Sequence, residues 1–176
     1  MHGLTRRCWS NEAGVGAVEF ALIAPFILIA MLGSFQVFAL ARARMLAVAA
    51  TRNLADLVSQ QASVTALEVV DYCKGAKLSL LPLNTTGFAA SVASVSYVNT
   101  ARKVDWINTS CGAVSAIANA ASDAAPVTTT SGDSAIVVKA SFRYASPLTF
   151  PLALDVTFSI SALARPRSGT PVTYGS

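Results

Sequence analysis

Residues 14–41, GVGAVEFALIAPFILIAMLGSFQVFALA, form the longest apolar segment of this chain. It carries a single charge, on Glu19, and the 22 residues from Phe20 to Ala41 carry none. A helix needs about 20 apolar residues to cross a hydrocarbon core of roughly 30 Å. The stretch is therefore long enough to span a membrane once. A carboxylate near its start costs free energy unless another group compensates its charge.

The remaining sequence is rich in Ala, Ser, Thr and Val, as in a small secreted domain that contains β-structure. A chain of 176 residues can hold one membrane anchor and one such domain. The formal net charge of +4 comes from scattered basic residues with no interleaved aromatic residues. We therefore expect no nucleic-acid partner.

Three interpretations fit residues 1–41. A secretory signal peptide would use Arg6 and Arg7 as its basic region and Ala39-Leu40-Ala41 as its cleavage site. The apolar region of a signal peptide, however, usually spans only about 7–15 residues. An ordinary uncleaved anchor fits the length but gives Glu19 no role beyond reaching the membrane edge. The third interpretation is a pilin-type leader peptide.

The segment Gly14-Val15-Gly16-Ala17-Val18-Glu19-Phe20 resembles the prepilin peptidase site of type IVb and Flp pilins. In that class the cut follows a glycine, and the mature protein carries Glu at its fifth position followed by an aromatic residue. A cut after Gly14 makes Val15 the first mature residue, Glu19 the fifth and Phe20 the sixth. The resemblance implies prepilin peptidase as a partner and residues 1–14 as a cleaved cytoplasmic leader.

The wider sequence resembles the TadE/TadG-like proteins of the tight-adherence (Tad/Flp) pilus system. The resemblance rests on Glu19–Pro25 (EFALIAP), Gly33, residues 55–60 (ADLVSQ) and, more loosely, residues 132–144 and 164–169. It departs at Gln36-Val37, where many relatives carry another Glu-Phe pair. The short length favours a TadE-like minor pseudopilin, whose partners would be the inner membrane and the other pilins and pseudopilins of the system.

Cleavage would create a free α-amino group on Val15, one helical turn from Glu19. Both that amine and the N-terminus of the helix favour a nearby carboxylate. The resemblance implies that Glu19 meets the amine of a neighbouring subunit, whereas the spacing alone equally allows the amine of its own chain. Either pairing offsets two poorly solvated charges.

We predict one long helix from about Val15 to Ser63, with a transmembrane half over 15–41 and an amphipathic half over 42–63. Pro25 lacks an N–H, so a kink or local opening is expected there. Gly33 and Ser34 offer a point of close approach for another helix. A second helix should cover about 65–78.

A loop around Pro82 and residues 84–87 should lead into strands, with a short helix within 112–125. The fold class we expect is α+β and pilin-like, a long N-terminal helix packed on a small antiparallel sheet. A periplasmic domain would cover 64–169, and a flexible tail 170–176. The predicted strands are 91–99, 103–109, 134–144 and 155–164.

The positions of the cysteines are consistent with one membrane span followed by a domain in an oxidising compartment. Cys73 and Cys111 both follow the apolar stretch, so an oxidising compartment beyond the membrane would let them form a disulfide. No Cys/His spacing predicts a metal site, and His2 is the only histidine. No set of residues predicts catalysis, a cofactor or a small-molecule substrate. Tyr97 and Trp106 are expected to be core or strand-pairing residues.

Overall fold

The computed structural model describes residues 14–175. These residues form two compact units. One contains residues 14–39 together with the loop 146–154, and the other contains residues 40–145 and 155–175.

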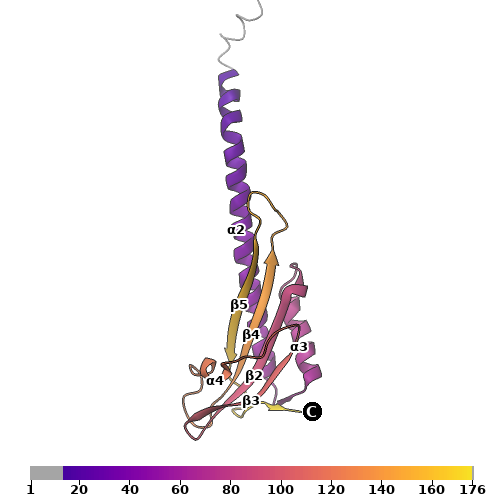
Figure 1. Ribbon diagram of the computed structural model, residues 1–176, viewed down its shortest axis with the longest axis vertical. Helices are drawn as coiled ribbons and strands as arrows, with labels where there is room; N and C mark the ends of the chain where they lie inside the picture. The colour runs from indigo at the N-terminus through magenta and orange to yellow at the C-terminus, as the bar shows by residue number, and fades with distance from the viewer. Residues whose placement is uncertain (1–13, 176) are drawn as a thin grey trace, which may run out of the picture. The chain divides into compact units, whose positions relative to one another are not determined.

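Helix α2 (Val15–Ser59) is the longest element and is drawn in indigo in Figure 1. Its helical structure continues through Pro25 without a break. It ends four residues before the predicted end at Ser63, because Ser63–Val64 form a short strand, β1, instead. The Ser59 carbonyl at the helix end accepts a hydrogen bond from the Arg167 N–H at 3.0 Å.

Helix α3 (Ala66–Leu78) confirms the predicted second helix. Its N-terminus is closed by a capping box, in which the Thr65 hydroxyl accepts from the Glu68 N–H and the Glu68 carboxylate accepts from the Thr65 N–H. The buried face of α3 carries Cys73, which forms a disulfide with Cys111 at a Cα–Cα distance of 5.6 Å. The predicted bridge is therefore present, and it ties α3 to the end of strand β3.

The four-stranded sheet is antiparallel, with the order β3-β2-β4-β5. Its strands are β2 (Phe88–Val98), β3 (Ala101–Cys111), β4 (Ser134–Ala145) and β5 (Asp155–Ala164). All four predicted strands are confirmed, with β2 and β3 longer than expected. A short 3-10 helix (Thr85–Gly87) precedes β2, and the short helix expected within 112–125 is α4 (Ala120–Asp123).

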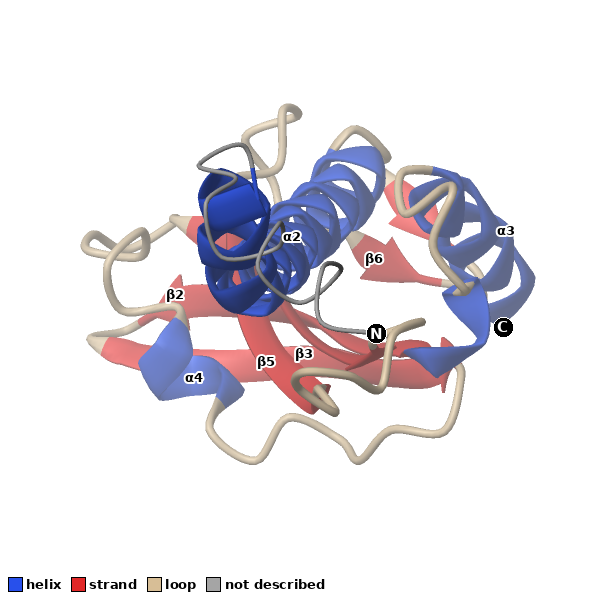
Figure 2. Ribbon diagram, turned by 90° about the horizontal axis from the view of Figure 1, so that it is seen from above, coloured by secondary structure: helices blue, strands red, loops and turns tan. Residues whose placement is uncertain are grey.

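The central strands β2 and β4 are buried on both faces, because helices lie on both sides of the sheet. Figure 2 shows α2 and α3 over one face and α4 over the other. On the α4 side, Ala93 and Val137 pack with Ile117 and Ala124. The face of α2 that is buried has mostly small side chains at helical spacing, which lets the helix approach closely. These residues are Ala43, Ala47, Ala50, Thr51, Leu54, Ala55 and Val58.

The expectation of a flexible tail is wrong for the described residues 170–175. Strand β6 (Thr173–Tyr174) pairs in parallel with β1, and Val172 is buried. The Trp106 indole N–H donates to the Val172 carbonyl at 2.7 Å, and its ring lies 5.2 Å from that of Tyr174. Trp106 pairs with Ser94 between β2 and β3, which confirms the predicted strand-pairing role, and its side chain also holds a segment whose polar composition indicates no structure. Ser176 lies outside the described residues.

Candidate functional site

The first half of α2 presents an apolar surface with almost nothing packed on it. None of its most apolar 18-residue window is buried, and the side chains of Phe20 and Phe26 are 69% and 73% exposed. Exposed apolar area costs about 25 cal/mol per Å² in water. By length and composition α2 is the one helix among residues 14–175 that could cross a membrane. The geometry therefore fits a helix surrounded by lipid or by other apolar helices.

The predicted processing site lies at the start of this helix. Gly14 is the first described residue, and α2 begins at Val15. A Cβ atom added to Gly14 or to Gly16 would meet nothing within 4 Å, so neither glycine is required by packing. The predicted leader up to residue 13 lies outside the described residues, and so does Cys8.

Glu19 and Phe20 are both exposed on α2. Glu19 follows Val15 by four residues, a spacing that places two side chains on the same face of a helix. None of the ion pairs within residues 14–175 involves Glu19. Its carboxylate therefore faces outward, available to an amine from its own chain or from another.

Gln36 is a site residue that sequence reasoning did not identify. It is the only buried residue between Gly14 and Phe38, with 1% of its surface exposed. Its side-chain amide is bonded to the loop 146–154, which joins β4 to β5 and runs beside α2 in Figure 1. The carbonyl oxygens of Leu148 at 2.9 Å, Phe150 at 3.2 Å and Leu152 at 3.0 Å lie around Gln36 Nε2 and share its two N–H donors. In return the Leu152 N–H donates to Gln36 Oε1 at 3.1 Å.

These contacts explain why an amide and not a carboxylate suits position 36. A carboxylate can accept the Leu152 N–H but cannot donate to three carbonyl oxygens. Gly33, one turn before Gln36, lies against Pro151 of the same loop, where an added Cβ would lie 3.8 Å from the proline ring. The close approach that we predicted at Gly33 is therefore made by this loop rather than by another helix.

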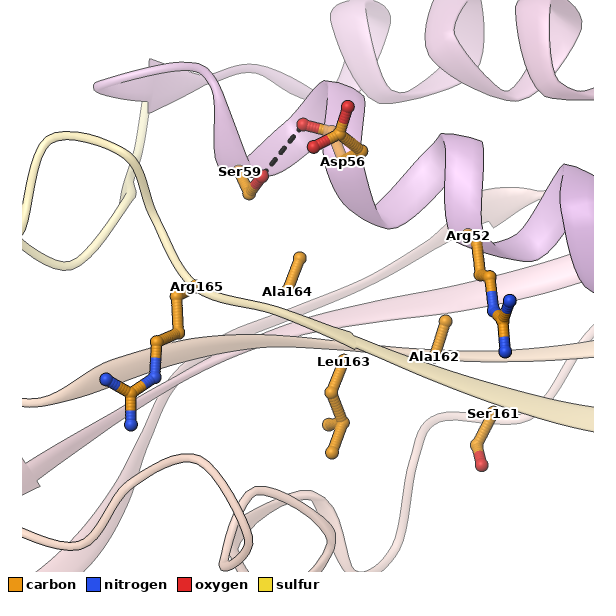
Figure 3. A pocket seen from close by; sticks show the side chains of 8 residues that line it. All are labelled: Arg52, Asp56, Ser59, Ser161, Ala162, Leu163, Ala164 and Arg165. Carbon is orange, nitrogen blue, oxygen red and sulfur yellow. Dashed lines mark hydrogen bonds between the residues drawn. The ribbon is translucent and has the colours of Figure 1, made fainter.

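A shallow groove of about 570 Å³ lies where the end of α2 meets β5. Figure 3 shows Arg52 and Asp56 on the helix and Ala162 to Arg165 on and after the strand. Asp56 pairs with Arg167 at 3.3 Å, and Arg165 donates to the Val127 carbonyl at 2.8 Å. Both arginines follow β5 in the segment 164–169, and Asp56 belongs to the segment 55–60. The structure thus brings together two segments that carried the family resemblance.

Residues 14–56 match the family model described as TadE-like protein. The chain carries a TadE-like segment. The match begins at the glycine of the predicted cleavage site, which confirms the resemblance to TadE/TadG-like proteins of the Tad pilus system. No curated protein and no solved structure matches the chain.

The TadE-like segment contains the exposed apolar helix, Glu19 and Gln36, but the loop that Gln36 binds lies outside it. Across residues 14–175 no group of three or more His, Cys, Asp or Glu side chains could hold a metal ion. The TadE-like family is a family of pilus structural and assembly components.

Two carboxylates on the folded domain, those of Asp133 and Asp155, have a lowered pKa. Hydrogen bonds from the backbone N–H groups of Thr130 and Thr129 lower the pKa of Asp133 to about 2. Hydrogen bonding from the Arg143 guanidinium lowers the pKa of Asp155, with an Nε–Oδ1 distance of 2.9 Å. Arg143 and Asp155 flank the uncharged loop 146–154 in sequence. The two residues on either side of this loop therefore form an ion pair.

Proposed function

We propose that this protein is a TadE-like minor pseudopilin needed for assembly of a Tad/Flp (type IVb) pilus. The observation that carries the proposal is that the family match and helix α2 begin at adjacent residues, Gly14 and Val15, on either side of the predicted cut. This coincidence supports processing that leaves a helix with a free amine at its first residue.

The proposed location is the bacterial inner membrane, crossed once, with the leader in the cytoplasm and the domain from Arg42 onward in the periplasm. Two features support this orientation. The apolar half of α2 has the length of one span, and the disulfide between Cys73 and Cys111 belongs in an oxidising compartment.

In assembly, the exposed apolar half of α2 would pass from lipid into a bundle with the helices of other pilins and pseudopilins. Generic packing of apolar side chains supplies most of the attraction but does not fix the axial register of neighbouring helices. The Glu19 carboxylate, paired with the α-amine of a neighbouring subunit, would fix that register. Its exposed position and the lack of an ion pair within residues 14–175 support this role.

The test is to delete the gene and restore it with either of two matched variants, Gly14→Leu and Gly16→Leu. Neither glycine has a neighbour within 4 Å of an added Cβ, so the folded protein should accommodate both substitutions. We expect Gly14→Leu to keep its leader and to yield no pili, whereas Gly16→Leu is processed and restores pili. Leader removal is followed by mobility on a gel, and pili are counted by electron microscopy.

If Gly14→Leu restores pili as well as the wild-type gene does, processing at this site has no part in assembly. An uncleaved, fully functional chain would instead favour a permanently anchored single-pass envelope protein that acts as a binding or scaffold module.

A further inference from the structure

The loop between β4 and β5 has an unusual composition for a loop on a folded domain. The segment 144–154, YASPLTFPLAL, contains no charge, and the ion pair Arg143–Asp155 brackets it. Within the loop, Leu148, Phe150 and Leu152 are exposed, and Phe150 is 62% exposed. Loops in contact with water are normally polar, and a cluster of exposed apolar side chains marks an interaction surface.

The loop is attached to α2 inside the uncharged run. Its carbonyls at 148, 150 and 152 share the two N–H donors of the Gln36 amide. Gln36 precedes Ala41, the last residue of that run, by five positions. At a rise of about 1.5 Å per residue this is about 7.5 Å along the helix axis. The loop therefore meets the helix at a level that belongs to the membrane span and not to its flank.

The hydrogen bonding of the loop fits a site at the boundary between lipid headgroups and acyl chains. In water, exposed backbone carbonyls need no protein donor, because solvent supplies one. In hydrocarbon every backbone polar group must be satisfied by the protein. The two N–H groups of the Gln36 amide lie within hydrogen-bonding distance of three loop carbonyls, the Gln36 oxygen accepts the Leu152 N–H, and the Ser146 N–H donates to the Leu154 carbonyl at 2.8 Å. The backbone N–H groups of Thr149, Phe150, Ala153 and Leu154 have no protein partner among residues 14–175, so headgroups or water must bond to them. A polar side chain on a spanning helix is itself costly unless it is bonded in this way.

We propose that the loop 146–154 is a second membrane-associated element, which lies at the boundary between the lipid headgroups and the acyl chains in the leaflet at the Ala41 end of the span. Leu148, Phe150 and Leu152 contact the lipid, and Gln36 holds the backbone of the loop against α2. The inference rests on the membrane span of the proposed function. The partner is lipid rather than a protein groove, because the loop is continuous with the apolar surface of the spanning helix.

The test measures the depth of single labels in lipid vesicles. The full-length chain with Cys8→Ser is given one new cysteine, because Cys73 and Cys111 are joined and do not react. The three labelled variants are Phe150→Cys, Ile27→Cys in the middle of the span, and Ser131→Cys on an exposed turn of the domain. Each carries an environment-sensitive fluorophore in vesicles of phosphatidylethanolamine and phosphatidylglycerol, with or without lipids that carry a doxyl quencher.

We expect the Phe150→Cys label to emit at shorter wavelength than the Ser131→Cys label and to lose most of its fluorescence to doxyl groups placed high on the acyl chain. Aqueous iodide should quench only the Ser131→Cys label. A Phe150→Cys label that iodide quenches as strongly as it quenches the Ser131→Cys label would overturn the inference. Protection from iodide without doxyl quenching would also overturn it, because protein would then cover the loop.

The Ile27→Cys label separates this inference from the proposed function. If doxyl lipids quench the label at 27 but not the label at 150, the helix spans the membrane and the loop does not enter it. If neither label is quenched, the membrane span itself is wrong, and the loop inference falls with it.

Discussion

Asp56 in the last turns of α2 and Arg167 beyond β5 are 111 residues apart in sequence and form an ion pair at 3.3 Å. The contact joins the end of the TadE-like segment to the segment that follows the last strand of the sheet. Both side chains are more than half exposed, so solvent screens the attraction between them. Exposed pairs of this kind contribute about 0–1 kcal/mol.

We therefore predict that Arg167→Ala lowers the free energy of unfolding by less than about 1 kcal/mol. The matched comparison is Leu54→Ala on the buried face of α2, where loss of a fully buried side chain should cost about 2–5 kcal/mol. Both values come from denaturant unfolding of the detergent-solubilised protein, followed by circular dichroism. If Arg167→Ala and Leu54→Ala lower the free energy of unfolding equally, the ion pair contributes more to stability than a solvent-exposed pair should.

The disulfide should contribute more than any ion pair. Replacing both cysteines, as Cys73→Ser with Cys111→Ser, should lower the free energy of unfolding by about 2–5 kcal/mol, because the bridge restricts the unfolded chain. Reduction of the wild-type protein should have the same effect, and reductant should not change the stability of the double variant. A wild-type protein insensitive to reductant would contradict the role of the bridge.

Gln36→Glu should release the loop 146–154 without disturbing the rest of α2. The carboxylate would face the carbonyl oxygens of Leu148, Phe150 and Leu152, to which it cannot donate. Hydrogen exchange should show loss of protection at the Leu152 N–H, which Gln36 Oε1 accepts in the native protein. Ser34→Ala, at an exposed position two residues before Gln36, is the control and should leave that N–H protected. If the hydrogen-exchange rate of the Leu152 N–H is unchanged in Gln36→Glu, Gln36 does not hold the loop 146–154 against α2.

The low pKa of Asp133 gives stability a defined dependence on pH. Its folded pKa of about 2 lies below the ordinary aspartate value, so the ionised carboxylate stabilises the folded state. This contribution is complete above about pH 4, where the unfolded group is also ionised, and it is lost as pH falls toward 2. The stability difference between wild type and Asp133→Ala should therefore shrink between those two values. A difference that stays constant over this range would contradict the prediction.

Much of the fold could be predicted because local sequence signals decide it. The uncharged run and the lack of any Gly or Pro between Gly33 and Gly75 predict a long helix, and the structure has one up to Ser59. The strands from Ser134 and Asp155 were predicted almost to the residue, since Val-rich alternation marks them. The Thr65-x-x-Glu68 pattern also signals the start of α3.

The features that sequence reasoning missed depend on distant backbone groups. Gln36 bonds to main-chain carbonyls more than 110 residues away, and no side-chain pattern reveals such acceptors. The available signal was a lone amide in an uncharged run, next to a departure from the family pattern. Strand β6 was missed for a similar reason, because its partner β1 forms only where α2 stops. Both features are consequences of tertiary structure.

Processing after Gly14 is tested by the identity of the first residue of the membrane-extracted protein. Mass spectrometry of the N-terminal peptide, from cells that express prepilin peptidase, would establish it. We expect Val15, with Gly14 as the last residue of the released leader. An intact Met1 would contradict processing, and a first residue beyond Ala41 would show that the apolar stretch is a secretory signal and not the stem of a pilin-like helix.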